Sequence, residues 1–131
     1  MKEDTKKLAR HRIARSWNAF QEGDALFEKK FYSGAVNRFY YAAFYAARAL
    51  LATKQLDSSK HSGVISLFHE HFVGTGLVDK EKSKALSRSF EQRQDSDYED
   101  FILIHEEECK ALKRLVEVFI QDCDRAFKQI L

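Results

Sequence analysis

The segment from Asn37 to Leu51, NRFYYAAFYAARALL, decides the fold class. It contains no proline, glycine or carboxylate, and its apolar residues recur at intervals of three and four, the spacing of a helix. On a helical wheel of about 100° per residue, one wide arc is apolar. This arc contains Val36, Phe39, Tyr40, Ala43, Phe44, Ala46, Ala47, Leu50 and Leu51. We therefore expect a central helix that is packed on most sides, with alanines that let neighbouring helices approach closely.

The polar residues of the same helix form one stripe, here called the polar seam. It consists of Asn37, Arg38, Tyr41, Tyr45 and Arg48. In one interpretation the two arginines pair with carboxylates of other helices, while the tyrosines keep their hydroxyls at the surface. In the other, the polar seam binds nucleic acid or a nucleotide, or a second copy of the chain, because arginine forks onto phosphates and stacks on aromatic rings.

The remainder of the chain predicts an all-α fold. Proline is absent, glycine occurs five times, and the long segments repeat at three and four. A length of 131 residues suits a single domain that spans residues 1–131. Helices are expected at about 6–28, 35–53 (with Ser33 as its N-cap), 60–72, 79–93 and 103–128. Short loops between them favour an up-and-down bundle.

Composition excludes several classes of protein. The apolar content of 44% is too high for a disordered chain, and the apolar runs are too short to span a membrane. The first fifteen residues lack the apolar core of a signal peptide, so we expect a cytoplasmic location. Cys109 and Cys123, about 21 Å apart on one predicted helix, are expected to be reduced thiols.

A basic patch precedes the central helix. The run from Lys6 to Arg15, KKLARHRIAR, carries five basic residues and no acid. These are Lys6, Lys7, Arg10, Arg12 and Arg15. The patch is either a solvated helix face, on which Arg12 tolerates substitution better than Arg48 does, or a surface that holds an RNA backbone with the help of Trp17. The run EDFILIHEEE is its acidic counterpart in a dimer or complex.

The histidines predict no metal site. His69 and His71, two residues apart, fall on opposite sides of a helix, and no other cluster has ligand spacing, so neither a metal nor a cofactor is expected. His61 is a capping or core histidine, or else contacts a phosphate alongside Lys60. Phosphate-binding glycine motifs and a serine-nucleophile elbow are absent.

Three motifs together resemble those of the HEPN superfamily, in particular its small stand-alone proteins from bacteria and archaea. They are NRFYYAAFYAAR, KHSG and, from Arg93 to Tyr98, R-x-x-x-D-Y. The resemblance implies a HEPN-like bundle of four long helices and one short one that forms a homodimer. It also implies a minimal nucleotidyltransferase as partner in a toxin–antitoxin-like pair, and contact with RNA, since many family members bind RNA and some are metal-independent ribonucleases.

The chain departs from the catalytic pattern that this resemblance brings with it. Active family members carry an arginine followed four to six residues later by a histidine. Arg93 matches the arginine, but Tyr98 stands five residues on, and His105 lies beyond the pattern. A tyrosine, with a pKa near 10, is a poor base at neutral pH. We therefore expect a binding module first, a ribonuclease that uses Arg93 at a dimer seam second, and a helical interaction domain without a nucleic-acid role third.

Overall fold

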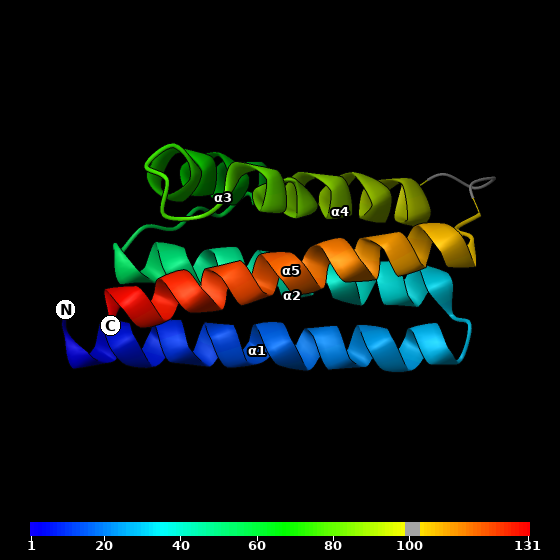
Figure 1. The fold of residues 1–131 in the computed structure, drawn as a ribbon, viewed down its shortest axis with the longest axis horizontal. Coiled ribbons are helices and arrows are strands. Elements are labelled where there is room, and N and C mark those ends of the chain that lie inside the picture. The colour runs from blue at the N-terminus through cyan, green and yellow to red at the C-terminus, as the bar shows by residue number, and fades with distance from the viewer. Residues whose placement is uncertain (99–102) are drawn as a thin grey trace.

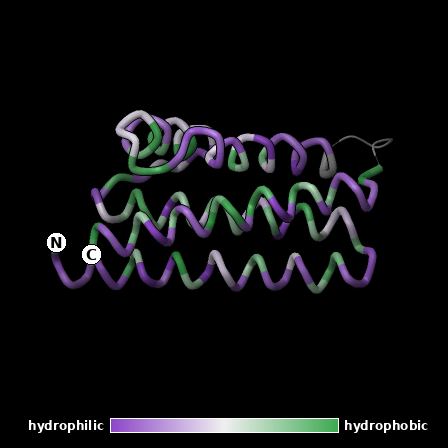
Figure 2. The backbone as a smooth tube through the Cα atoms, in the orientation of Figure 1, coloured by the Kyte–Doolittle hydropathy of each residue, from purple (hydrophilic) through white to green (hydrophobic). Residues whose placement is uncertain are grey.

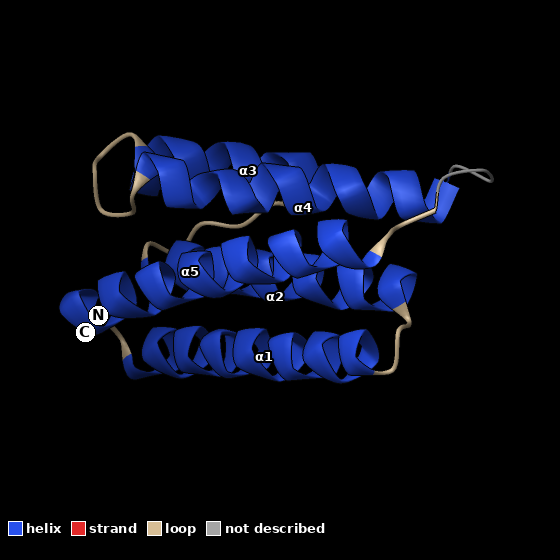
Figure 3. Ribbon diagram, turned by 45° about the vertical axis from the view of Figure 1, so that its right-hand side comes forward, coloured by secondary structure: helices blue, strands red, loops and turns tan. Residues whose placement is uncertain are grey.

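The chain folds into helices joined by short loops, as the computed structural model shows (Figures 1 and 3). The structure describes residues 1–98 and 103–131, with side chains at 1–95 and 103–131. The elements are α1 (Glu3–Glu28), α2 (Tyr32–Thr53), α3 (His61–Phe68), the π-helical turn η1 (His69–Val73), α4 (Lys80–Tyr98) and α5 (Glu106–Ile130). The predicted all-α bundle of four long helices and a short one is confirmed. Within the described ranges, no helix is both long and apolar enough to cross a membrane.

Helix α2 lies at the centre of the bundle. In Figure 1, α1 forms one layer, α2 and α5 the middle layer, and α3 and α4 the layer on the other side. Helix α2 contacts α1, α3, α4 and α5. Every residue of the apolar arc predicted from the sequence is buried, Tyr40 completely, and the hydrophobic parts of the chain in Figure 2 concentrate in the middle layer. The periodicity of this segment therefore predicted its environment correctly.

A glycine allows α1 and α2 to pack closely. A Cβ atom built on Gly23 of α1 would lie 2.6 Å from two ring carbons of Phe39 of α2. The Phe39 ring also packs against Phe20, with ring centroids 5.4 Å apart. Glycine inside a helix usually costs about 0.5–1 kcal/mol relative to alanine. Here the space that a methyl group would need is filled by an aromatic ring.

The turn from α1 to α2 differs from the prediction. Ser33 is not the N-cap of α2, because the helix begins at Tyr32 and the capping position is Phe31, without a side-chain cap. Lys30 adopts a left-handed conformation (φ 67°), and the Phe31 N–H donates to the Leu26 carbonyl at 2.9 Å. This backbone bond closes α1 in the manner of a Schellman motif. The chain can therefore start α2 without a capping side chain.

Three other helix boundaries also differ from those expected. Helix α4 continues to Tyr98, beyond the predicted end at residue 93, and α5 starts at Glu106 rather than at residue 103. The predicted helix 60–72 changes to π-helical geometry at His69, where the Gly74 N–H donates to the carbonyl five residues earlier at 2.7 Å.

Both cysteines are free thiols in the core of the bundle. Burial raises the pKa of Cys109 to about 11 and raises that of Cys123 well above its ordinary value. Neither thiol therefore carries an appreciable thiolate fraction at neutral pH.

Candidate functional site

Arginines from three helices stack on the tyrosines of the polar seam. The Arg15 guanidinium of α1 lies 4.3 Å from the Tyr45 ring centroid and donates a hydrogen bond to the Tyr45 hydroxyl at 2.9 Å. Arg38 of α2 and Arg93 of α4 lie 5.1 and 5.4 Å from the Tyr41 ring centroid. Both tyrosines are half-buried. The result is a continuous arginine–tyrosine surface over α1, α2 and α4, with each guanidinium within cation–π range of a ring.

Among the described residues, opposite charge around Arg38 is sparse. Arg38 donates to the Asn37 side-chain carbonyl at 3.1 Å, and Glu22, whose side chain is 61% exposed, lies 3.9 Å away. An ion pair of this length and exposure contributes little free energy. Arg38 thus has a neighbouring acid from α1, yet its guanidinium remains largely available to another anion.

His61 lies beside Arg93, a proximity that the spacing in the sequence does not reveal. The hydroxyl of the fully buried Tyr40 is 2.6 Å from His61 Nδ1, and the Arg93 guanidinium is 5.4 Å from the Tyr40 ring centroid. The imidazole also stacks on Phe44, with ring centroids 4.5 Å apart. Burial, then the charges of Arg93 and Arg48, lowers the pKa of His61. The imidazole is therefore neutral at pH 7.

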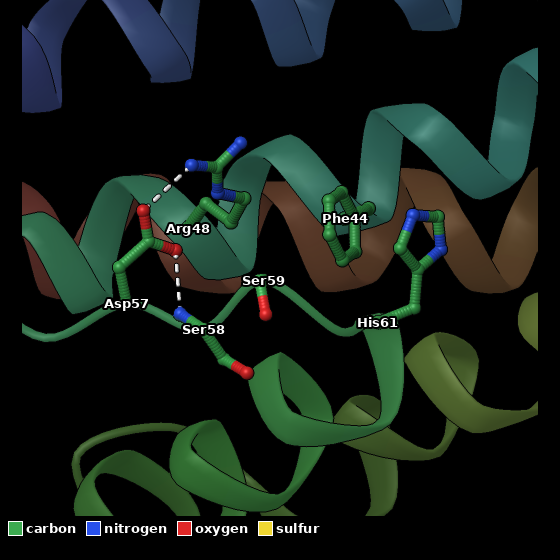
Figure 4. Close-up of a pocket in the computed structure, with 6 residues that line it drawn as sticks. All are labelled: Phe44, Arg48, Asp57, Ser58, Ser59 and His61. Carbon is green, nitrogen blue, oxygen red and sulfur yellow. Dashed lines mark hydrogen bonds and ion pairs between the residues drawn. The ribbon is translucent and has the colours of Figure 1, made fainter.

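A cleft of about 540 Å³ opens where the chain passes from α2 into α3 (Figure 4). Its lining residues are Phe44, Arg48, Asp57, Ser58, Ser59 and His61. Arg48 donates to Asp57 Oδ2 at 2.8 Å, and the Arg12 guanidinium lies 3.5 Å from the same oxygen. Burial alone would raise the pKa of Asp57, but the hydrogen bonds from Arg48 and from the Ser58 N–H, with the charges of both arginines, lower it. One ionised carboxylate therefore serves two guanidinium groups.

The basic patch is not one solvated face. Lys7, Arg10 and Arg15 are exposed, whereas the Arg12 side chain is only 14% exposed and donates to the Arg48 carbonyl at 3.3 Å. The expectation that Arg12 faces solvent is wrong, because the loop after α2 supplies a carboxylate that draws it into the bundle. Lys6 is half-buried and lies 3.6 Å from Glu3.

Lys60 and Tyr98 complete the set of site residues predicted from the sequence. Lys60 is exposed at the N-terminal boundary of α3. Tyr98 is the last residue of α4, and its side chain lies outside the described part of the structure. Within the described residues, no three histidine, cysteine, aspartate or glutamate side chains are grouped in a way that could hold a metal ion.

Comparisons with known proteins agree with this architecture. A family model described as the HEPN domain matches residues 9–126. A UPF0332 protein of Thermotoga maritima is 35% identical over 127 residues, which are 97% of this chain and 96% of that protein. Two Methanocaldococcus jannaschii proteins bear the names "Putative toxin MJ0142" and "Putative toxin MJ0605". They are 33% and 39% identical, over 82% and 81% of this chain and 74% and 78% of their own lengths.

Proposed function

Because this chain belongs to the HEPN domain family, we propose that it is the HEPN component of a toxin–antitoxin-like pair, which binds RNA and has a minimal nucleotidyltransferase as its partner. The toxin names of two relatives support the assignment to a toxin–antitoxin-like pair. The arginine–tyrosine surface supports RNA binding.

The observation that carries RNA binding is the stacking of Arg15, Arg38 and Arg93 around Tyr41 and Tyr45. Guanidinium groups bind phosphate oxygens through paired N–H donors, and tyrosine rings stack with bases of any sequence. A surface that alternates the two suits a single strand, in which phosphates and unpaired bases are both accessible.

Fluorescence anisotropy of a labelled mixed-sequence single-stranded RNA tests this assignment. We expect affinity to fall as salt rises from about 50 to 200 mM, and Arg38→Ala to weaken binding and to reduce the salt slope by about one. Arg114→Ala is the matched control, because this arginine is exposed on α5, a helix that contributes nothing to the arginine–tyrosine surface. If the two substitutions change the RNA affinity equally, or if the affinity does not depend on salt concentration, the alternative of a helical interaction domain without a nucleic-acid role is favoured.

The proposed partner is tested by sequencing the genes beside that of this chain and by co-expressing the chain with any minimal nucleotidyltransferase that they encode. Co-elution of the two proteins in size-exclusion chromatography supports the pairing. Separate elution, or the absence of such a neighbouring gene, contradicts it.

Metal-independent cleavage of RNA is a second candidate, favoured by the position of His61 next to Arg93. We still expect binding without measurable cleavage, since Tyr98 replaces the motif histidine and a tuned proton-transfer group is worth about 10²–10⁴ in rate. The protein is incubated with RNA in the presence of a chelator and the products are resolved on a denaturing gel. Products ending in a 2′,3′-cyclic phosphate, lost in Arg93→Ala, would establish the ribonuclease in place of the simple binder. A gain of cleavage in Tyr98→His would place position 98 in that site.

A further inference from the structure

At the cleft between α2 and α3, one carboxylate is shared by two arginines. Arg12 and Arg48 both converge on a single oxygen of Asp57, at 3.5 and 2.8 Å. Arg48 Nε is buried and has no hydrogen-bond partner among the described residues. A buried donor without an acceptor costs free energy, about 1–3 kcal/mol in typical cases. Asp57 alone therefore does not satisfy all the hydrogen-bond donors of the Arg48 guanidinium.

His61 lines the same cleft. Phe44 lies between the two polar side chains, with the Arg48 guanidinium 5.9 Å and the His61 ring 4.5 Å from its ring centroid (Figure 4). Tyr40 engages His61 at Nδ1, and within the described part of the chain no hydrogen bond involves Nε2. The hydroxyls of Ser58 and Ser59 border the same space.

We propose that this cleft binds one phosphate group of an RNA strand through Arg48 and His61, and that Asp57 competes with the phosphate for the two arginines. The inference rests on the proposed function only for the source of the phosphate. Guanidinium and imidazole N–H groups are the donors that proteins use for phosphate, and a carboxylate that occupies the arginines at rest lowers the affinity for any external anion.

The site couples phosphate binding to protonation of His61. The groups around the imidazole are Tyr40, Tyr41, Phe44 and Arg48 from α2, and Phe90 and Arg93 from α4. Asp57 lies at the other end of the cleft, beside Arg48 (Figure 4). In the free protein, burial and the two arginines lower the pKa of His61. A bound phosphate opposes those positive charges and raises this pKa. Binding therefore tightens as the pH falls through the pKa of His61.

The probe for this site is adenylyl-adenosine, whose phosphodiester keeps one negative charge throughout the pH range in which histidine titrates. Proton NMR follows the imidazole resonances of His61 as a function of pH, with the dinucleotide and with adenosine, which lacks the phosphate. We expect the dinucleotide, and not adenosine, to raise the pKa of His61. His61→Gln should abolish the pH dependence of the affinity, and Arg114→Ala should leave it unchanged.

Asp57→Asn provides a gain-of-binding test. Asparagine keeps a side-chain oxygen to accept the Ser58 N–H but removes the competing charge. We expect Asp57→Asn to bind the dinucleotide about two- to fivefold more tightly, the scale of a partly exposed ion pair. A loss of affinity in a folded Asp57→Asn variant would contradict the proposed site. The NMR spectrum of the variant shows whether it is folded. If it is unfolded, the His61 titration of the wild type decides.

An unchanged pKa of His61, or the same response to adenosine, would overturn the inference. The same experiments test the proposed function independently of this phosphate site. If long RNA binds through Arg38 while His61→Gln has no effect, the protein binds RNA without this phosphate site. If neither RNA nor the dinucleotide binds, both proposals are wrong.

Discussion

At the scale of single residues, Asp57 connects charges that are far apart in the sequence. Arg12 and Arg48 both contact its Oδ2 atom. The sequence predicted that only Arg48 has a structural role, whereas the structure shows that the two arginines pair with the same carboxylate. We expect Arg48→Ala and Arg12→Ala each to lower the free energy of unfolding by about 0.5–1 kcal/mol, because the pairs are partly exposed. The exposed Arg10→Ala is the control and should have no measurable effect.

Urea denaturation of the single variants and of the double variant measures this coupling. Since both arginines use the same oxygen, the double variant should lose less stability than the sum of the two single losses. Strict additivity, or an equal effect at Arg10, would show that the shared carboxylate does not organise this corner of the bundle.

A second residue-scale prediction concerns Asp122 of α5, which is only 6% exposed. Its oxygens accept hydrogen bonds from the Asp79 N–H, just before α4, and from Arg125 Nε, both at 2.8 Å. Burial alone would raise the pKa of Asp122, but these bonds and the Arg125 charge lower it. Its stabilising contribution is therefore complete above the unfolded pKa of about 3.9 and is lost as the pH falls through the lower folded pKa.

Thermal melting of the wild type and of Asp122→Asn between pH 7 and pH 3 tests this linkage. At pH 7 we expect the variant to lose about 1–3 kcal/mol, the range for hydrogen bonds to a charged group. The difference between the two proteins should begin to shrink near the unfolded pKa of about 3.9 and should disappear as the pH falls through the lower folded pKa of Asp122. A difference that is constant with pH would mean that the Asp122 charge contributes nothing.

At the scale of elements, the sequence predicts the faces of helices better than their ends or their neighbours. The apolar arc of α2 followed from periodicity because a core-facing stripe repeats with the helix itself. The prediction that Ser33 caps α2 is wrong, because backbone hydrogen bonds around Phe31 close the turn and no side chain caps the helix. The proximity of His61 to Arg93 joins two helices, and no local pattern encodes it.

The central position of α2 predicts a strong sensitivity to side-chain volume. Ala43 and Ala46 are completely buried. We expect Ala43→Leu and Ala46→Leu each to cost about 1–3 kcal/mol, because extra methylene groups overpack a filled core. Ala111→Leu, at an exposed position of α5, is the control and should change the melting temperature little. Wild-type melting temperatures in both core variants would show that the core around α2 accommodates the added volume.

At the scale of the whole molecule, we expect a homodimer. The half-buried tyrosines and arginines of the polar seam form a surface suited to self-association, and the HEPN resemblance implies the same state. Light scattering at micromolar concentration should give about twice 15.3 kDa. A monomeric mass at that concentration would reject the dimer. Loss of the dimer in Arg38→Ala would place the interface on the polar seam.

The contact between Gly23 and Phe39 has a consequence for how this family can diverge. A methyl carbon at position 23 would lie 2.6 Å from the Phe39 ring, so a side chain there requires this buried ring to move. The two positions are therefore constrained to evolve together: a homologue with alanine at the first should carry a smaller residue at the second. Gly23→Ala alone should destabilise the bundle despite the better helix propensity of alanine, and a compensating Phe39→Leu should recover part of the loss.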